Sequence, residues 1–485
     1  MRRVGFMGFA AVAATVGTVV PAAAVEGVPL AARTSVDCGR EELRLTLENR
    51  TGKARTFTVT GPDAKRTVRE VGPRASTAVR WALPDGARYA LRVTAPGGFA
   101  VRDAGRASCG LGPGTPGMNT TRLFSTDAPF QALLHDDGRA RPGTARSVRI
   151  PALAVTNSGT LLAVTDARVA GPPDLPADIQ LGLRRSTDDG ATWSAPRIAV
   201  HAESTRDGTG DSSLLVDRVT GRVFLFYNYA RPGTGFFERN AKSMRVMYVT
   251  SDDDGRTWSR PVDLTARVKK PGWTKLFASS GHGIQLSGGR LVQPLVHRDA
   301  RSTYAENIVS DDHGRTWRTG ARAGSAVNES KPVQRSTGVL AQNMRHNEKG
   351  ARYYAVSPDG TRPYGPMRRA AALPDPANNA DEISYLRPRP GAPGLTRTVL
   401  FSNTASAVRR HELTVRLSRD DGAHWPYRAV LKPGRAGYSA LAVLRDGSVG
   451  CLYEVGDTGG IFFARFTPEW LTQRNGGTPQ GTAVP

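Results

Sequence analysis

A short pattern that occurs four times decides the fold: Ser186-Thr-Asp-Asp-Gly-Ala-Thr-Trp193, Ser251-Asp-Asp-Asp-Gly-Arg-Thr-Trp258, Ser310-Asp-Asp-His-Gly-Arg-Thr-Trp317 and Ser418-Arg-Asp-Asp-Gly-Ala-His-Trp425. Ser, Asp, Gly and Trp stand at the same offsets in every copy. The first three copies follow one another at intervals of about 60 residues, and such a period indicates a repeat architecture with one supersecondary unit per repeat.

Each copy has the chemistry of a turn between two strands. Asp can bond nearby backbone amides, Gly tolerates positive φ, and Trp can fold back against neighbouring structure. The gap between the third and fourth copies is about twice the others, which predicts a degenerate copy between them. Ser357-Pro-Asp-Gly360 fits this expectation, with Tyr364 in the place of the Trp.

The segments between the copies predict strands. Runs such as Val223-Phe-Leu-Phe-Tyr227 and Arg245-Val-Met-Tyr-Val249 are short, rich in β-branched and aromatic residues, and bounded by Gly, Pro or Asp. Five repeat positions and a first set of strands near Arg149 indicate about six units. We therefore predict an all-β chain in which residues 121–475 form a six-bladed β-propeller.

The N-terminus has the three zones of a secretory signal peptide. Arg2 and Arg3 are followed by an apolar run over 4–20 and by Ala22-Ala-Ala24. We expect residues 1–24 to be removed and the protein to be secreted to the extracellular space. No other apolar run approaches the roughly 20 residues of a membrane span, and residues 476–485 are expected to be a flexible polar tail without an anchor.

Residues 30–110 are predicted to form a small immunoglobulin-like β-sandwich, because apolar residues such as Leu43, Leu45 and Leu47 alternate with polar ones. Cys38 and Cys109 bracket this segment, and such a pair in an exported domain predicts a structural disulfide. The Gly- and Pro-rich residues 111–120 are expected to be a linker. Cys451, the third cysteine, is expected to be a buried free thiol.

The formal net charge is +23, carried mostly by Arg. The basic residues are scattered, without a basic run, a zinc finger or an aromatic RNA-binding motif, so the sequence gives no support for a nucleic-acid partner. Attraction of an anionic substrate or a cell surface stays an alternative to a merely Arg-rich composition. Histidine is sparse and no His/Cys cluster has ligand spacing, so neither a metal nor another cofactor is expected.

Further motifs resemble those of the bacterial exo-α-sialidases (neuraminidases), in particular the secreted actinomycete members. Val148-Arg149-Ile-Pro151 is similar to the Arg-Ile-Pro motif of that family, and Asn328-Glu329-Ser-Lys331 to its glutamate-bearing segment. Gly437-Tyr438-Ser439 followed by Tyr453-Glu454 is similar to its closing motif. The likeness covers about residues 121–471 and includes the repeat, which in that family is called the Asp box and lies on a six-bladed propeller.

The resemblance implies a set of substrate-binding residues. Arg149, Arg345 and Arg410 match the three arginines that grip a carboxylate, although Arg409 is an alternative to Arg410 on spacing alone. Glu454 matches the glutamate that orients the first arginine. Two further contacts are implied, namely Arg168 toward the glycerol or ring oxygens and Asp211 in the region that lines the N-acetyl pocket.

The resemblance also implies the catalytic residues. Tyr438 would be the nucleophile, Glu329 its base, and Asp174 the acid/base, with Asp178 as a nearby alternative to Asp174. A tyrosine suits this substrate, because a carboxylate nucleophile would be repelled by the carboxylate of sialic acid whereas a phenol is neutral until its proton leaves. Three guanidinium groups suit the same carboxylate, since they form charge-assisted and partly bidentate hydrogen bonds.

The function expected from the resemblance is that of a monomeric exo-α-sialidase. It would hydrolyse terminal α-ketosidically linked sialic acids from glycoproteins, glycolipids and oligosaccharides, with retention through a covalent tyrosyl intermediate. Three alternatives stay open: a propeller lectin that binds sialylated glycans without cleaving them, a trans-sialidase or anhydro-forming relative, and an enzyme for a related acid such as KDN or KDO.

Overall fold

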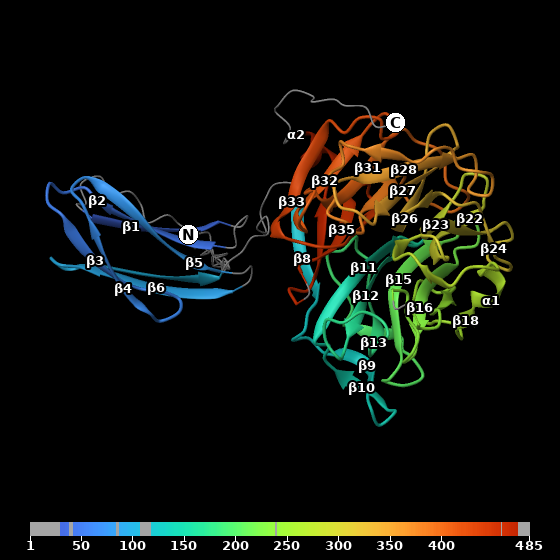
Figure 1. Cartoon of the computed structure of the whole chain (residues 1–485), viewed down its shortest axis with the longest axis horizontal. Coiled ribbons are helices and arrows are strands. Elements are labelled where there is room, and N and C mark those ends of the chain that lie inside the picture. Colours follow the sequence, from blue (N-terminus) through green and yellow to red (C-terminus); the bar gives the residue numbers. More distant parts are fainter. Residues whose placement is uncertain are drawn as a thin grey trace, which may run out of the picture. The chain divides into compact units, whose positions relative to one another are not determined.

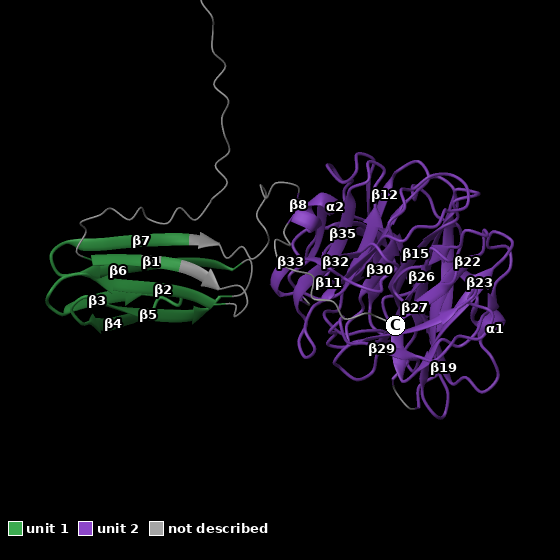
Figure 2. Cartoon of the chain, turned by 90° about the horizontal axis from the view of Figure 1, so that it is seen from above, with its two compact units in different colours: residues 1–107 green, residues 108–485 purple. Residues whose placement is uncertain are grey.

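The computed structural model describes residues 30–37, 42–83, 87–106, 118–237, 240–456 and 458–473. The chain divides into two compact units, residues 1–107 and 108–485 (Figure 2). Strands are the main regular structure of the described residues, which hold only two short helices, α1 (Thr265–Val268) and α2 (Pro468–Gln473), so the predicted all-β fold is confirmed. The predicted signal peptide, the Cys38–Cys109 disulfide and the tail 476–485 lie outside the described residues.

The first unit consists of two sheets with strand orders β1-β2-β5 and β4-β3-β6-β7. Alternation sets its core, because Leu43, Leu45 and Leu47 are fully buried while Arg44 between them is exposed. Residues from both sheets share this core, including Phe57 of the second sheet. The strands are β1 (Leu30–Asp37), β2 (Glu42–Asn49), β3 (Arg55–Thr60), β4 (Arg66–Val71), β5 (Ala75–Ala82), β6 (Arg88–Ala95) and β7 (Phe99–Arg106).

The described residues of the second unit form six sheets. The first contains β9 (Phe130–Leu134), β10 (Ala140–Gly143), β11 (Ser147–Val155), β12 (Leu161–Arg168), β13 (Ile179–Ser186) and β14 (Arg197–Val200). The second contains β15 (Gly208–Val216), β16 (Val223–Ala230), β17 (Arg245–Ser251), β18 (Val262–Asp263) and β20 (Gly281–His282). The third contains β19 (Lys275–Ala278), β21 (Ile284–Gln285), β22 (Leu291–Arg298), β23 (Thr303–Ser310), β24 (Arg318–Thr319) and β25 (Gly324–Ser325).

The remaining three sheets have four strands each. The fourth contains β26 (Val327–Gln334), β27 (Leu340–His346), β28 (Arg352–Ser357) and β29 (Arg368–Ala370). The fifth contains β30 (Asp381–Ser384), β31 (Val399–Thr404), β32 (His411–Ser418) and β33 (Tyr427–Arg435). The sixth contains β34 (Ser439–Val443), β35 (Val449–Glu454), β36 (Ile461–Phe466) and, from the start of the unit, β8 (Met118–Phe124).

The six sheets follow one another in a closed ring. β11 contacts β15, β15 contacts β19 and β21, β22 contacts β26, β26 contacts β30, β30 contacts β34, and β34 returns to β11. Figure 1 shows β11, β15 and β26 near the middle of the unit and β10, β18 and β24 near its rim. β8 pairs with β36, so the beginning of the unit completes its last sheet. Met118 is buried in β8, and residues 118–120 of the predicted linker are therefore strand.

Counted outward from the innermost strand of each sheet, the repeats form the turn that follows the third strand, as their chemistry predicts. Ser186, the last residue of β13, donates its hydroxyl to Asp188 Oδ1 at 2.7 Å and accepts the Gly190 amide at 2.9 Å. The same carboxylate accepts the Thr192 amide at 2.9 Å. In the fourth copy His424 replaces this Thr, and its Nδ1 lies 2.7 Å from the Asp420 carboxylate, so the turn is kept.

Aromatic residues of the repeats pack against neighbouring sheets, although the ring contact of Trp425 is with Phe401 of its own sheet. Trp193 lies edge-on to Phe463 of β36, with ring centroids 5.1 Å apart, and Trp317 lies edge-on to Phe226 of β16 at 5.2 Å. In the predicted degenerate copy the Gly360 amide donates to the Ser357 hydroxyl at 3.0 Å. Tyr364 there accepts a hydrogen bond from Asn307 of β23 at 2.8 Å and so contacts the preceding sheet. The repeats therefore fix both the turns and the spacing of the sheets.

The buried free thiol predicted from the sequence is confirmed, since Cys451 is buried in β35 without a disulfide partner. Burial raises the pKa of this thiol well above its usual value. The two helices are far shorter than the span of a bilayer core, and the described part of the chain holds no candidate membrane-crossing helix.

Gly314→Ala should destabilise the protein more than Gly289→Ala. Both glycines have positive φ, at 81° and 89°, so either substitution costs about 1–2 kcal/mol of backbone strain. A Cβ at Gly314 would lie 2.2 Å from the Phe224 ring, whereas one at Gly289 meets nothing within 4 Å. Overpacking should add about 1–3 kcal/mol at Gly314 only. Urea unfolding of the two variants measures the difference, and equal losses would contradict this account of the repeat.

Candidate active site

Three of the candidate residues, Arg149, Asp211 and Glu329, lie near the beginnings of β11, β15 and β26, where β-bulges turn them toward one another. The register of β11 shifts between Arg149 and Ala152, that of β15 between Gly210 and Ser213, and that of β26 between Val327 and Ser330. Ile150 and Asp211 in these bulges have φ of 59° and 57°. Bulges re-aim side chains and such backbone strain gathers at functional sites, so the local geometry singles out this end of the ring.

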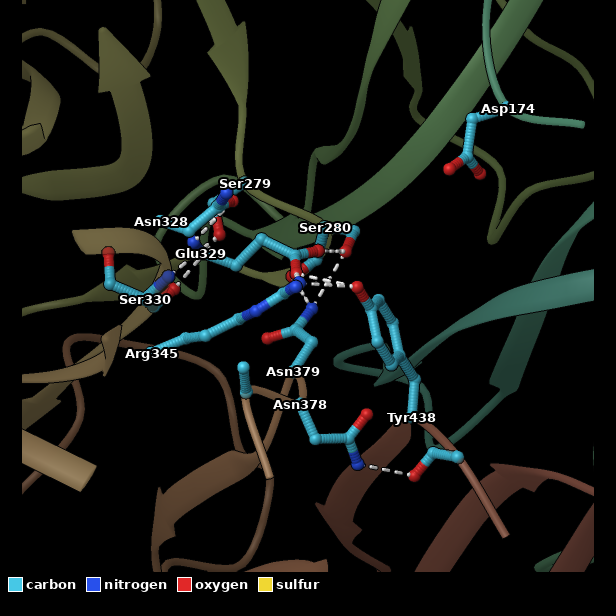
Figure 3. A network of polar contacts seen from close by, with 12 residues as sticks. Asp174, Ser279, Ser280, Asn328, Glu329, Ser330, Arg345, Asn378, Asn379 and Tyr438 are labelled. Carbon is cyan, nitrogen blue, oxygen red and sulfur yellow. Dashed lines mark hydrogen bonds and ion pairs between the residues drawn. The ribbon is translucent and has the colours of Figure 1, made fainter. Parts of the chain in front are cut away.

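Tyr438, Glu329 and Arg345 form the centre of the cluster (Figure 3). The Tyr438 hydroxyl donates to Glu329 Oε2 at 2.8 Å. Arg345 Nη1 donates to the same carboxylate oxygen at 2.6 Å and to the Tyr438 hydroxyl oxygen at 2.7 Å. The three side chains come from the loop before β34, from β26 and from β27, so the fold brings together residues more than 90 positions apart in sequence.

Glu454 holds the first arginine in place. It is 1% exposed and accepts hydrogen bonds from Arg149 Nε at 3.1 Å and Nη2 at 2.9 Å. The same carboxylate accepts the backbone amides of Ile150 at 3.2 Å and Tyr438 at 2.8 Å. A Cβ on Gly437 would lie 2.6 Å from Glu454 Oε1, so only glycine leaves room for the carboxylate beside Tyr438.

Of the two alternatives for the third arginine of the predicted set, Arg410 is the one that lies beside Tyr438. Its Cζ lies 5.1 Å from the centroid of the Tyr438 ring, and that of Arg149 lies 5.3 Å from the same ring. Arg410 is half-buried and donates to the Ala377 carbonyl at 3.2 Å, while Arg409 is exposed. Three guanidinium groups therefore surround one phenol, and Arg409 is not among them.

Asp174 lies on the loop between β12 and β13 and stands apart from the Tyr438 cluster in Figure 3. Its carboxylate is 75% exposed and pairs at 2.6 Å with Arg168, whose side chain is 1% exposed. Arg168 Nη1 also donates to the Pro172 carbonyl at 2.6 Å, and Leu175 packs against an apolar cluster that includes Phe277. The loop is thus anchored on both sides of an exposed carboxylate.

Asp178, the alternative to Asp174, has a different environment. It is half-buried and accepts a hydrogen bond from Gln180 at 3.1 Å. Burial, together with Asp136, raises the pKa of Asp178 to about 6 although the Gln180 bond opposes the rise. Asp174 instead pairs with Arg168, and its charge also acts on Arg149 and Asp211.

Asp211 is linked electrostatically to Glu329 of the Tyr438 cluster and to the Asp174–Arg168 pair. Its amide donates to Asp166 Oδ1 at 3.1 Å and its carboxylate accepts from Asn228 at 3.2 Å. Burial raises the pKa of Asp211 to about 7, and the charges of Glu329 and Asp174 add to the rise. Asp166, also buried, lies at 3.5 Å from Arg168 Nη2, and this residue was not anticipated from the sequence.

A second group that the sequence did not reveal lies behind Glu329. Ser280 donates its hydroxyl to Glu329 Oε1 at 2.8 Å. Lys331, fully buried, donates to the Ser280 carbonyl at 2.6 Å and to Asn379 Oδ1 at 2.8 Å, and Asn379 Nδ2 donates back to the Ser280 hydroxyl at 2.8 Å. The only hint in the sequence was a charged residue within an otherwise buried strand.

The charges of the site have opposite effects on its two central groups. Burial raises the pKa of Tyr438 to about 12, with the charge of Glu329 adding to the rise while Arg345, Arg410 and Arg149 oppose it. Burial alone would also raise the pKa of Glu329, but Arg345, Lys331 and the bonds from Tyr438 and Ser280 outweigh it and hold that pKa below its usual value. At neutral pH the pair is therefore a phenol beside a carboxylate.

The ring of sheets and this cluster define an all-β repeat protein with an arginine-lined site for an anion. Residues 159–451 match the family model described as BNR repeat-like domain, and residues 23–106 match that of the bacterial phospholipase C C-terminal domain. Sialidase of Micromonospora viridifaciens is 41% identical over 339 residues, which cover 67% of this chain and 52% of that protein. Exo-alpha-sialidase of Aspergillus fumigatus is 31% identical, with coverages of 64% and 78%.

Solved structures show the same fold. The Hadza microbial sialidase Hz136 superimposes with a TM-score of 0.63 at 24% identity, covering 90% of this chain and 96% of that one. A leech intramolecular trans-sialidase gives a TM-score of 0.62 at 16% identity, with 92% of each chain covered. The chain belongs to the sialidase family with BNR repeats. It spans only about half of the Micromonospora protein and 59% of the Bacteroides fragilis sialidase, which is 32% identical.

Proposed function

We propose that this protein is an exo-α-sialidase that removes terminal α-linked sialic acids from glycoproteins, glycolipids and oligosaccharides. The observation that carries the proposal is the Tyr438 hydroxyl, held between Glu329 at 2.8 Å and Arg345 at 2.7 Å with two more arginines over its ring. The sialidases among its relatives support the same reaction.

The proposal extends to the architecture. The six sheets of the second unit are taken as the blades of a six-bladed β-propeller, closed by the β8–β36 pairing. The two-sheet first unit is taken as an immunoglobulin-like sandwich that acts as a spacer. The apolar N-terminal segment supports secretion, and the protein is taken to act as a monomer.

The three arginines would bind the substrate carboxylate. Guanidinium groups form planar, charge-assisted hydrogen bonds with a carboxylate, and Glu454 orients Arg149 through its Nε and Nη2. The sialic acid ring would then lie over Tyr438. Asp211 would face the N-acetyl group, and Arg168 the glycerol or ring oxygens while it holds Asp174.

Tyr438 would attack the anomeric carbon as its proton passes to Glu329. A phenol with a pKa of about 12 is a weak nucleophile at neutral pH, so the adjacent carboxylate is needed to accept the proton during attack. The bond to the leaving oxygen breaks as Asp174 protonates that oxygen, and Asp174 then activates the water that releases the sugar. Two displacements at one carbon give retention through a covalent tyrosyl intermediate.

Tyr438→Phe should lower kcat for the N-acetylneuraminic acid conjugate of 4-methylumbelliferone by at least about a hundredfold. Binding of free N-acetylneuraminic acid should persist, because the arginines are unchanged. Fluorescent release and calorimetric binding measure the two effects. Near wild-type turnover in this variant would refute the assignment of Tyr438 as the nucleophile. Binding of sialic acid without any release of methylumbelliferone by the wild-type protein would indicate a lectin.

Product analysis separates the remaining alternatives. The fold neighbours include intramolecular trans-sialidases, although likeness at 16% and 19% identity concerns the fold alone. Free sialic acid as the product from sialyllactose supports hydrolysis, while a 2,7-anhydro product or transfer to added lactose supports the alternative. Release from the KDN conjugate alone would keep the mechanism and change the substrate.

The loss of activity caused by Asp174→Ala should depend on the leaving group of the substrate. General acid assistance contributes about 10²–10⁴-fold for a poor leaving group, so cleavage of sialyllactose should fall by that factor. Formation of the tyrosyl intermediate from the methylumbelliferyl conjugate needs little protonation and should fall far less in pre-steady-state measurements. Asp178→Ala is the matched control and should leave this ratio unchanged. The reverse result would assign the acid/base role to Asp178.

Lys331→Met should move the acid limb of the pH profile of kcat/KM upward by about one pH unit. Glu329 must be ionised to accept the phenol proton, and its pKa is held low partly by Lys331, so removing that charge raises the pH at which activity is lost. Lys432→Met, which removes another buried lysine, should leave the limb in place. An unchanged limb in Lys331→Met, with an intact fold, would refute the electrostatic role.

A further inference from the structure

A cavity of about 440 Å³ lies at the other end of the same innermost strands. Its lining includes Val155, Val216 and Val443, the last residues of β11, β15 and β34. No candidate active-site residue lines the cavity, and Arg149 and Tyr438 lie near the opposite ends of β11 and β34, so the cavity does not belong to that site. Its volume falls within the range of about 300–1,000 Å³ that is typical of small-molecule sites.

The walls of this cavity are apolar, but the charged groups that line it are mainly cationic. Leu153, Leu214 and Leu441 contribute the apolar surface, together with Ile383. Arg218, Arg387 and Arg389 supply three guanidinium groups. None of these three arginines forms an ion pair with a carboxylate in the described part of the chain; Arg387 and Arg389 are exposed, and Arg218 is half-buried.

Arg218 carries most of the argument because neutral groups hold it in place. Its Nη1 donates to Asn157 Oδ1 at 3.3 Å and its backbone amide to Gln285 Oε1 at 2.7 Å. Its carbonyl accepts from Asn157 Nδ2 at 2.9 Å and from the Gly391 amide at 2.7 Å. Burial without a counter-charge lowers the pKa of Arg218 to about 10.

Three acidic groups near the cavity are already engaged, while a fourth, Glu469 of α2, is exposed and acts on Tyr385. Asp381 lies 2.8 Å from His282 Nε2 and accepts the Leu441 amide at 2.5 Å. Asp217, next to Arg218, accepts from Gln285, Thr220 and the Val219 amide and lies 2.8 Å from His313 Nδ1. Asp446, near Tyr385, pairs with Arg465. The lining thus carries more positive charge than the nearby carboxylates offset, and an anionic ligand can neutralise the excess.

We propose that this cavity binds a small organic anion with an apolar body, such as an aryl or alkyl carboxylate, sulfonate or phosphate. The anionic group lies against Arg218 and is approached by Arg387 and Arg389 from the loop after β30. The apolar body lies against the leucine and valine side chains at the ends of the strands. This site is separate from the sialic acid site and does not depend on the proposed activity.

Three naphthalene probes of similar size test the proposal. Calorimetric titration compares naphthalene-2-sulfonate with 2-naphthalenemethanol and 2-naphthylmethylammonium at physiological salt. The sulfonate is expected to bind at least tenfold more tightly than the neutral probe, and the ammonium least. Saturating N-acetylneuraminic acid should leave sulfonate binding unchanged, and displacement by that acid would place the probe in the active site and overturn the proposal.

Matched variants separate a built site from general attraction to a cationic protein. Arg218→Gln should weaken sulfonate binding at least tenfold and leave the neutral probe unchanged, whereas Arg260→Gln removes an exposed charge elsewhere and should change neither. Ala154→Phe places a ring at the wall of the cavity and should block the sulfonate while sialidase turnover persists. Equal effects of Arg218→Gln and Arg260→Gln, or full binding in Ala154→Phe, would refute the site.

Discussion

The pair formed by Glu454 and Arg149 is the constraint on which the site depends. One carboxylate, buried and without access to water, accepts two guanidinium and two backbone hydrogen bonds, and these come from β11 and from the loop of Tyr438. A buried charge persists only when such partners satisfy it. The same interaction therefore joins the first and last sheets of the ring, sets the rotamer of Arg149 and fixes the backbone of the proposed nucleophile.

The ring explains how distant residues reach this position with little freedom. Each innermost strand begins at the same end of the unit, and bulges in β11, β15 and β26 turn one functional side chain inward at that end. The aromatic residues of the repeats pack at the outer turns, far along the strands from the bulges, and so set the sheets without entering the site. The residues that hold the sheets together and the candidate functional residues thus lie at different places along the strands.

The sequence predicted the parts of the molecule that depend on local patterns. Turn chemistry at Ser186, Ser251, Ser310 and Ser418, and the weaker copy at Ser357, led to the all-β repeat fold. Motif order and spacing led to Tyr438, Glu329 and the arginines. The sequence could not predict the pairing of Arg168 with Asp174, nor the Lys331, Ser280 and Asn379 group, because these contacts join side chains whose partners are set by sheet packing rather than by spacing.

The charges of the site also account for a tyrosine at its centre. Arg149, Arg345 and Arg410 bring three positive charges around the ring, and their partners Glu329 and Glu454 bring two negative ones, so one positive charge remains among these five groups. Under the proposed function, a substrate with a single carboxylate would neutralise that remainder. A carboxylate in the place of Tyr438 would already have cancelled it and would repel the substrate at the point of attack. In the proposed mechanism, a phenol that stays neutral until Glu329 takes its proton would keep the positive charge available for binding and would become the nucleophile only afterwards.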